Sequence, residues 1–286
     1  MRQNTPLFAQ HSRRWRENHY VYPVISRRSR GLSIGINLSP GKACTFHCVY
    51  CSVDRTIPGE AGPVDLEVLT RELDVLLAQA QTGELWADGP LAKTPPALRR
   101  LNDVAFSGDG EPTAAAEFPR AAEIVAGALA RHALPAKIVV ITNASLLDQP
   151  EVARTLAFLD AHRGEVWVKL DAGTEEHYRA MDRSSVPYER VLANILAAGW
   201  KRAIVIQSMF ARLHGQPPPD AEIQAWLGRL RALVAGGCRI DHVQVYTAAR
   251  RTCEPFVQPL DDAAVDAIAA RVRALGLAAE AFYGPR

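Results

Sequence analysis

The stretch GKACTFHCVYCSVDRT, residues 41–56, holds three of the five cysteines of this chain. Cys44, Cys48 and Cys51 form a C-x3-C-x2-C pattern directly after an apolar run at 32–38. Thiolates are ligands that select zinc or iron–sulfur clusters. In a parallel α/β fold, a loop after a strand lies at the carboxyl ends of the strands, where active sites collect. The pattern therefore predicts a catalytic metal site on this loop.

Short apolar runs rich in β-branched residues alternate along the chain with segments of helical periodicity. Such runs are typical of parallel strands that are covered on both faces. The strand candidates lie at 32–38, 102–108, 137–143, 166–172, 203–210 and 241–247. The helical segments lie at 66–80 with Asp65 as N-cap, at 119–132, from 150, from 174 and on over 187–199, at 223–234 and at 261–276.

This alternation predicts an α/β fold whose parallel strands are joined by right-handed crossovers. Six strand–helix units are too few for the usual closed barrel of eight. We therefore expect a curved, incompletely closed barrel over residues 32–286. A flat, doubly wound sheet is the alternative.

Two stretches lie outside the alternation. Residues 1–31 form a basic N-terminal extension, expected to pack on the barrel, with arginines around Trp15. Arginines interleaved with aromatic residues are typical of contacts to RNA. The alternative is a structural role, in which these arginines offset the charge of the cysteine site or pair with carboxylates. Residues 84–100 have the composition of an irregular insertion.

Composition narrows the class of protein. Hydrophobic residues make up 48% of the 286 residues and charged residues 22%, as in ordinary globular proteins. The net charge of +2 argues against a general polyanion binder. No apolar run reaches the roughly 18–20 residues of a membrane-spanning helix, and residues 1–20 lack the apolar core of a secretory signal. Five cysteines, three of them clustered, favour reduced thiols in the cytoplasm over a disulfide framework.

The number of cysteines distinguishes between kinds of metal site. A structural zinc site needs four ligands, commonly two C-x2-C pairs, and Cys238 and Cys253 are too far apart in sequence to form a second pair. Three thiolates on a four-iron cubane leave one iron without a protein ligand, and an open iron is a place for chemistry. A zinc site completed by His47 or a distant cysteine, an electron-transfer cluster and isolated buried thiols are the alternatives.

A second motif, FSGDGEPT at 106–113, closes the second strand candidate. Gly108 and Gly110 allow a close approach of backbone to a ligand. A carbonyl near Gly108 and the carboxylate of Glu111 are acceptors for an ammonium group. A simple turn is the alternative, and the position one strand–helix unit after the cysteines favours the ligand site.

Together these motifs resemble those of the radical S-adenosylmethionine (SAM) enzymes, including an aromatic residue, Tyr50, before the last cysteine. The resemblance implies a partial (β/α)6 barrel and a 4Fe–4S cluster on Cys44, Cys48 and Cys51. Its free iron would chelate SAM, and reductive cleavage would give a 5′-deoxyadenosyl radical that removes a hydrogen atom from a substrate. The second motif, from Gly108 through Asp109 and Gly110 to Glu111, would hold the SAM amino group.

The longer string at 23–56 is similar to the Fe–S oxidoreductase branch of this superfamily, which includes the tRNA-modifying 4-demethylwyosine synthase. The likeness continues in the same order at VVITNASLL, VKLDAG, YRAMDR and VQVYTAARR, over roughly residues 20–255. The wyosine enzymes hold a second cluster with cysteines upstream of the motif, and here no cysteine precedes Cys44. His47 and Ser52 also differ from the residues expected there. These departures indicate a separate subfamily with its own substrate.

Several polar residues at strand ends are candidates for binding SAM. Thr142 and Asn143 end the third strand candidate, where they are expected to contact the SAM ribose or carboxylate; an Asn-initiated turn is the alternative. Gln207 lies on the fifth strand candidate. It is expected to contact SAM or to be a hydrogen-bonded core amide.

Lys169 and Asp171 alternate with Trp167 and therefore share one face of a strand. A Lys–Asp pair facing the barrel interior is unfavourable to bury without a function or mutual pairing. We expect both to act on cofactor or substrate, with a structural ion pair as the alternative; a lysine here also suits a Schiff base with a carbonyl substrate. Arg250 and Arg251 follow the sixth strand candidate and are expected to bind an anionic substrate or a phosphate, or to be solvated.

The sequence thus predicts a cytoplasmic radical SAM enzyme that takes electrons from an external donor such as flavodoxin or ferredoxin and has no membrane partner. The substrate, a small molecule or RNA, is expected near Lys169, Asp171 and Arg250. Three alternatives remain open: tRNA modification of the wyosine-synthase type, transfer of the aminocarboxypropyl group of SAM, and a non-catalytic metal- or RNA-binding protein.

Overall fold

The computed structural model describes residues 13, 15–60 and 62–284. The chain forms two compact units, each built from three segments. Unit 1 comprises Met1–Cys44, Ile57–Ile141 and Gln149–Glu165, and unit 2 comprises Thr45–Thr56, Thr142–Asp148 and Val166–Arg286. The cysteine stretch is therefore divided between them, with Cys44 in unit 1 and both Cys48 and Cys51 in unit 2.

Unit 1 contains the strands β1 (Val21–Ser26), β2 (Gly31–Ile36), β3 (Leu101–Phe106) and β4 (Lys137–Thr142), adjacent in that order. β1 pairs with β2 in antiparallel register, whereas β2, β3 and β4 are parallel. Every residue of β2 is buried. Burial on both faces explains why the sequence of β2 does not alternate between apolar and polar residues.

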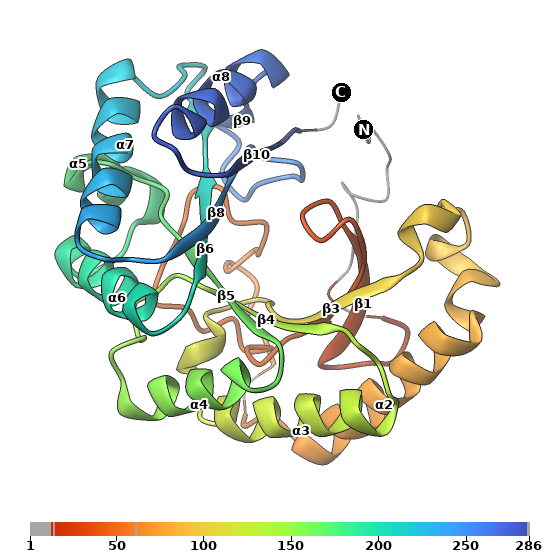
Figure 1. Cartoon of the computed structure of the whole chain (residues 1–286). Helices are drawn as coiled ribbons and strands as arrows, with labels where there is room; N and C mark the ends of the chain where they lie inside the picture. The colour runs from red at the N-terminus through yellow and green to blue at the C-terminus, as the bar shows by residue number, and fades with distance from the viewer. Residues whose placement is uncertain (1–12, 14, 61, 285–286) are drawn as a thin grey trace. The chain divides into compact units, whose positions relative to one another are not determined.

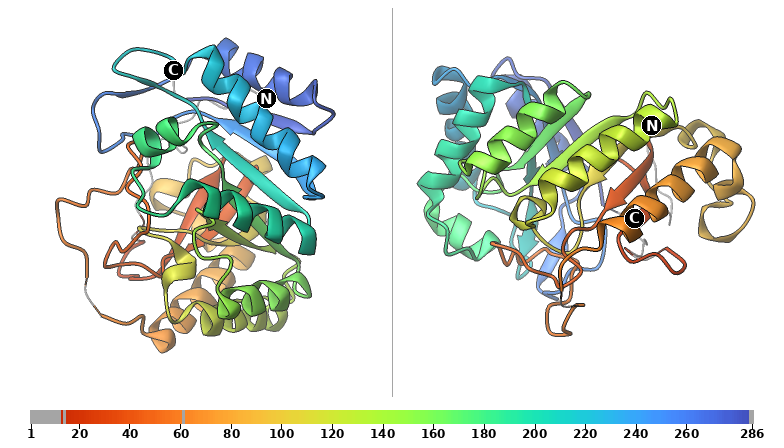
Figure 2. Two further views of the ribbon diagram at one scale, coloured as in Figure 1. Left: turned by 90° about the vertical axis from the view of Figure 1, so that its left-hand side faces the viewer. Right: turned by 90° about the horizontal axis from the view of Figure 1, so that it is seen from below.

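The helices of unit 1 are α2 (Leu66–Thr82), α3 (Phe118–Arg131) and α4 (Pro150–Asp160), which lie side by side in Figure 1 and Figure 2. α2 begins at the predicted N-cap, because the Asp65 carboxylate accepts hydrogen bonds from the amides of Glu67 (2.9 Å) and Val68 (3.1 Å). It ends at Gly83, whose φ of 82° is left-handed. Its buried face consists of the predicted apolar stripe: Leu69, Leu73, Leu76 and Leu77.

The stretch predicted as an irregular insertion forms three short 3-10 helices, η1 (Glu84–Trp86), η2 (Gly89–Leu91) and η3 (Pro96–Leu98). A further one, η4 (Pro112–Ala114), follows the glycine-rich motif. Of the basic extension, residues 21–26 are strand β1, whereas residues 1–12 and 14 lie outside the described residues.

Unit 2 contains the parallel strands β5 (Gly164–Lys169, of which Val166 onward belongs to this unit), β6 (Ile204–Met209), β8 (Ile240–Tyr246) and β10 (Ala279–Phe282). β6 pairs with β5 on one side and with β8 on the other, and β10 pairs with β8. Two three-residue strands, β7 (Ala211–Leu213) and β9 (Val257–Pro259), form a separate antiparallel pair.

The helices of unit 2 are α5 (Glu175–Asp182), α6 (Tyr188–Lys201), α7 (Asp220–Ala235) and α8 (Asp262–Arg273). α5 begins where Thr174 accepts a hydrogen bond from His177 N (3.2 Å). α8 begins where Asp261 accepts one from Ala264 N (2.8 Å). Both caps are residues of the type that the sequence predicts at helix starts.

The six predicted strands are confirmed, with ends shifted by at most three residues. Four further strands were not predicted from the sequence: β1, β7, β9 and β10. β1 contains Pro23, which is tolerated because β1 is an edge strand of unit 1. Among the described residues, no helix has the length and apolar character needed to cross a membrane.

Candidate cofactor site

The cysteine loop in unit 2 is fixed by backbone hydrogen bonds to the end of α5. His47 N donates to Asp182 O (2.9 Å), and Val49 N donates to Met181 O (2.8 Å). All five cysteines are free thiols, and the three of the motif are partly exposed. The loop thus carries Cys48 and Cys51 on a backbone that hydrogen bonds hold in place.

The sulfur of Cys51 accepts two hydrogen bonds from its own loop. The donors are Val53 N (3.4 Å) and Arg55 Nη1 (3.2 Å). A guanidinium and a backbone amide directed at one sulfur are groups that interact favourably with a thiolate. This environment suits a metal-binding thiolate.

The thiol of Cys48 lies 3.4 Å from Asp182 Oδ1. Burial, reinforced by the charge of Asp182, raises the pKa of the Cys48 thiol well above its usual value. Burial likewise raises the pKa of the Asp182 carboxyl. A bound metal ion deprotonates a coordinating thiol in spite of such surroundings.

Tyr50 connects the cysteine loop to the end of β5. Its hydroxyl donates to Asp171 Oδ2 and accepts from Lys169 Nζ, which lies 4.3 Å from the ring centroid. Asp171 is fully enclosed, and its other oxygen accepts a hydrogen bond from Met209 N (2.6 Å). Lys169 and Asp171, predicted from the sequence to share a face, therefore hold Tyr50 between them, with 3.6 Å separating Nζ from Oδ2.

The surroundings of Tyr50 and Lys169 determine the protonation states of both side chains. Burial raises the pKa of the Tyr50 hydroxyl well above its usual value, so it remains protonated at neutral pH. Burial alone would lower the pKa of Lys169, but electrostatic interactions with Tyr246 and with the Asp171 carboxylate outweigh burial and raise it. Lys169 is therefore an ammonium ion.

Apolar side chains of unit 2 surround this group. Cys48 packs against a buried cluster that contains Val49, Met209 and Tyr246, among others. An apolar environment strengthens each polar interaction within it. The loop that carries Cys48 and Tyr50 is consequently anchored by both packing and hydrogen bonds.

The glycine-rich motif in unit 1 lies close to other backbone. A Cβ built on Gly110 would lie 1.8 Å from Ala43 O, and one on Gly108 would lie 2.3 Å from Asn37 Oδ1. Glu111 N donates to Ala43 O (3.3 Å). The motif therefore packs against the chain one residue before Cys44, and only glycine fits at Gly110.

The acidic residues of the motif have partners within unit 1. Asp109 pairs with Arg13 Nη1 (2.8 Å) and accepts from Asn37 Nδ2 (2.7 Å). Glu111 is buried and accepts from the hydroxyl of Thr113 (2.7 Å). The Arg13–Asp109 ion pair is an arginine–carboxylate contact, which is the alternative to RNA binding that the sequence left open for the basic extension.

Thr142 and Asn143 form a turn after β4. Ser145 N donates to Asn143 Oδ1 (3.0 Å), and Ala144 N donates to Thr142 Oγ1 (3.1 Å). Asn143 Nδ2 also donates to Thr45 Oγ1 (2.8 Å), next to Cys44 in sequence. The structure thus contains the Asn-initiated turn weighed as the alternative, and this turn supports the cysteine loop.

Gln207 is fully buried on β6. Its Nε2 donates to Gln244 Oε1 (2.7 Å), while its Oε1 has no hydrogen-bond partner among the described residues. A buried polar atom without a partner is unfavourable unless a ligand satisfies it. Gln207 is therefore a hydrogen-bonded core amide through Nε2, one of the two roles expected from the sequence, and its Oε1 remains as an acceptor for a ligand.

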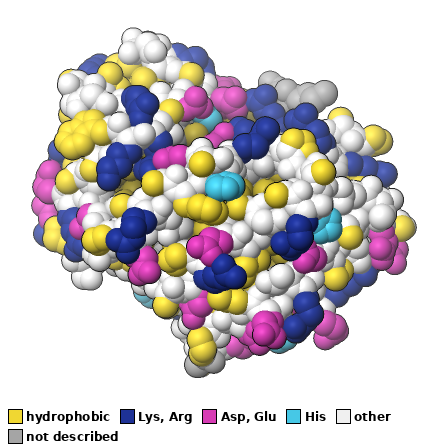
Figure 3. Space-filling model, turned by 60° about the horizontal axis from the view of Figure 1, so that its bottom comes forward, with side chains coloured by type: hydrophobic (Ala, Val, Ile, Leu, Met, Phe, Trp, Pro, Cys, Tyr) yellow, Lys and Arg dark blue, Asp and Glu magenta, His cyan; other side chains and the backbone are white. Residues whose placement is uncertain are grey.

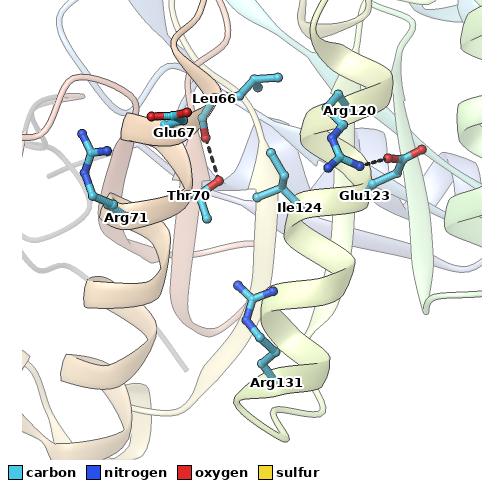
Figure 4. Close-up of a pocket in the computed structure, with 8 residues that line it drawn as sticks. All are labelled: Leu66, Glu67, Thr70, Arg71, Arg120, Glu123, Ile124 and Arg131. Atoms are coloured by element: carbon cyan, nitrogen blue, oxygen red, sulfur yellow. Dashed lines mark hydrogen bonds and ion pairs between the residues drawn. The ribbon is translucent and has the colours of Figure 1, made fainter.

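Among the described residues, one pocket lies within unit 1 and another within unit 2. One, of about 500 Å³ in unit 1, lies between α2 and α3 (Figure 4). Two of its three arginines have acidic partners, since Arg120 pairs with Glu123 and Arg131 with Asp74, whereas the exposed Arg71 has none among the described residues. The other, of about 420 Å³ in unit 2, includes Arg250.

Figure 3 shows Lys and Arg side chains interspersed with Asp and Glu over the face that it draws, as the small net charge predicts.

Sequence reasoning missed several supporting residues. Asp182, Asn37 and Arg55 contact Cys48, Asp109 and Cys51, respectively. Asp182 lies in the string YRAMDR and Arg55 in the quoted loop, yet nothing in either string indicates the contact. Only the folded chain brings these residues together.

A model of the Radical SAM superfamily matches residues 38–210, more than half of the chain. Among curated proteins, UPF0026 protein MJ1312 of Methanocaldococcus jannaschii is 27% identical over 192 residues, which is 65% of this chain and 52% of that protein. A UPF0026 protein of Helicobacter pylori is 26% identical over 61% of this chain and 48% of its own length. The chain thus spans about half the length of these two relatives.

Solved structures share the fold. TYW1 with a lysine–pyruvate adduct bound matches with a TM-score of 0.54 and 17% identity, over 86% of this chain and 74% of that one. The enzyme anSMEcpe with bound AdoMet matches with a TM-score of 0.56 and 14% identity, over 87% and 63%. The predicted fold class, a partial (β/α)6 barrel, is confirmed.

The chain belongs to the radical SAM superfamily. It is therefore an enzyme whose cofactors are a 4Fe–4S cluster and SAM. Its residues fit both: three free thiols lie on one short loop, and Gln207 keeps an unused amide atom. Among the described residues, no three His, Cys, Asp or Glu side chains are arranged to hold a single metal ion.

Proposed function

We propose that Cys44, Cys48 and Cys51 hold the 4Fe–4S cluster with one iron left open for SAM. Once reduced, a cluster held by these residues would supply the electron for reductive cleavage of SAM to methionine and a 5′-deoxyadenosyl radical that acts on a substrate. The spacing of three free thiols on one ordered loop carries this proposal.

We assign SAM binding to the glycine-rich motif and to the strand ends. Glu111 is a buried carboxylate able to accept from an ammonium group. Gln207 has a free acceptor atom in the core of unit 2. The remaining residues assigned to the cofactor are Tyr50, Gly108, Asp109, Thr142, Asn143 and Lys169.

The substrate is proposed to lie near Lys169, Asp171 and Arg250. The ammonium of Lys169 suits electrostatic contact with an anionic group. In this proposal Lys169 is a charged group; a role as a Schiff-base nucleophile would need its neutral amine.

Electrons are proposed to come from an external one-electron donor such as flavodoxin or ferredoxin. We further propose that the enzyme works in a reducing compartment such as the cytoplasm, where five free thiols persist.

The test is product analysis after anaerobic reconstitution. The protein, reduced with dithionite, is incubated with SAM, and 5′-deoxyadenosine is measured by mass spectrometry. The wild type should form it, the Cys48→Ala variant should not, and the Cys238→Ala variant, altered at a thiol outside the loop, should retain it. A brown, reducible wild-type protein that leaves SAM intact would refute the proposal. Release of 5′-methylthioadenosine instead would indicate aminocarboxypropyl transfer.

A further inference from the structure

The pocket in unit 2 lies between the end of β8 and strand β9. It has a volume of about 420 Å³, within the range of small-molecule sites. Its lining residues are Ala248, Arg250, Arg251, Thr252, Cys253, Pro255, Val257 and Pro259. The lining contains two arginines and no acidic residue.

Two acidic residues close to this pocket in sequence pair with arginines outside it. Glu254, in the same loop, pairs with Arg183, and Asp261 pairs with Arg212. Arg251 is exposed and makes no hydrogen bond or ion pair with another described residue. Its guanidinium is therefore available to a ligand, in contrast to Arg120 and Arg131 of the groove in Figure 4.

One part of the pocket wall is apolar and restricted in conformation. Pro255 and Pro259 have fixed φ angles, and Val257 and Pro259 belong to β9, which pairs with β7. Such a wall needs little ordering when a ligand binds, and this favours affinity. A preformed apolar wall with a few convergent polar groups is the usual construction of a ligand site.

The pocket also adjoins the cysteine loop. Cys253 N donates to Cys51 O (2.8 Å), and Cys253 Sγ donates to Val53 O (2.8 Å). Both contacts lie within unit 2. A ligand in this pocket would therefore contact the segment that is bonded to the cluster-binding loop.

We propose that this pocket binds a phosphate group of the substrate, with Arg250 and Arg251 as its ligands. The planar fork of a guanidinium matches the oxygens of a phosphate group in a bidentate manner, whether the phosphate is a monoester or a diester. The phosphate belongs to a small phosphate ester or to an RNA backbone, and the chemistry of recognition is the same. That the bound molecule is the substrate rests on the proposed function; phosphate binding does not.

Binding to the cluster-loaded protein tests this inference. Ribose 5-phosphate, ribose and a short RNA stem–loop are titrated by calorimetry into wild type and into Arg251→Gln, Arg251→Lys and Arg231→Gln. Arg231, on α7, is an exposed arginine of unit 2 outside the pocket and serves as the matched control. Alkylation of Cys253, followed by peptide mass spectrometry, reports occupancy of the pocket directly.

Ribose 5-phosphate should bind and slow alkylation of Cys253, whereas ribose should do neither. Arg251→Gln should weaken the phosphate-bearing ligand about 10- to 100-fold, the effect of one hydrogen bond to a charged group. Arg251→Lys should weaken it less, and Arg231→Gln should not change it. RNA binding that depends on Arg251 and falls steeply with salt would identify the RNA backbone as the source of the phosphate.

The inference is wrong if neither phosphate-bearing probe protects Cys253, or if Arg251→Gln and Arg231→Gln behave alike. Formation of 5′-deoxyadenosine is measured separately, so a failure here is distinct from a failure of the radical SAM proposal.

Discussion

Replacing Gly110 by alanine is the sharpest test of how the glycine-rich motif is packed. The added Cβ would lie 1.8 Å from Ala43 O and 2.7 Å from Ser39 Cβ. Real Cβ atoms essentially never approach closer than 3.0 Å, so the backbone must move by at least about 1 Å. The atom in the way is a backbone carbonyl and cannot rotate aside as a side chain would.

Two effects determine how much stability the Gly110→Ala variant loses. Overpacking of this kind costs about 1–3 kcal/mol, and displacing Ala43 also breaks its hydrogen bond to Glu111 N, worth about 1 kcal/mol. We expect the Gly110→Ala variant to lose about 2–4 kcal/mol. For a chain of this size each kcal/mol lowers Tm by roughly 2–4 °C, so the shift should be about 5–15 °C.

The control is Gly228→Ala, at a helical position of α7 where an added Cβ meets nothing within 4 Å. This variant should gain about 0.5–1 kcal/mol, because alanine is the better helix former. Calorimetric unfolding of both variants, with the cluster loaded, gives the comparison. If Gly110→Ala melts within 1 °C of wild type, the close approach to Ala43 is not a feature of the folded protein.

Three further outcomes are expected. Asp171→Asn should loosen Tyr50 and lower both the iron bound per chain after reconstitution and the sharpness of the reduced cluster's EPR signal; unchanged iron and spectrum would contradict the anchoring role. Burial raises the pKa of Cys238 to about 11, so at pH 8 its alkylation should be on the order of 100-fold slower in native than in unfolded protein, and equal rates would refute its burial. Burial raises the pKa of the Asp103 carboxyl despite hydrogen bonds from Ser29 and Ser33, and a carboxyl with a raised pKa makes the folded protein less stable as the pH rises through that pKa. The Asp103→Asn variant should therefore have a higher Tm than wild type at pH 7 but not at pH 3. Equal Tm values at pH 7 would contradict this.

The sequence predicted the parallel strands and helices because their evidence is local. Apolar runs mark the strands, and N-caps such as Asp65, Thr174 and Asp261 mark the starts of helices. β7 and β9 escaped prediction because three residues are too few for any period to be visible. β10, with the sequence AEAF, has one aromatic and no β-branched residue, so its strand character comes from pairing with β8.

The cysteine motif was recognised because its spacing is local, whereas its supports are not. Asp182 reaches Cys48, and Asn143 reaches Thr45, across more than ninety residues of sequence. Such contacts depend on the register of α5 and on the turn after β4, which no single stretch of sequence specifies. The same holds for the pocket that contains Arg251, whose wall is β9.

Lys169 and Asp171 show how a correct observation about a strand leaves two functions open. Their shared face was predicted from alternation alone, and the structure adds Tyr50 between them, with Lys169 Nζ over its ring. Moving any one of the three would leave a charge or a hydroxyl buried without its partner, which is strongly unfavourable. The group therefore fixes Tyr50, and with it the backbone on both sides, at the residue before Cys51. A lysine that also contacts cofactor or substrate can do so only through the part of its ammonium that remains exposed, about 20% of the side chain. That restriction makes it a fixed positive charge at the end of β5.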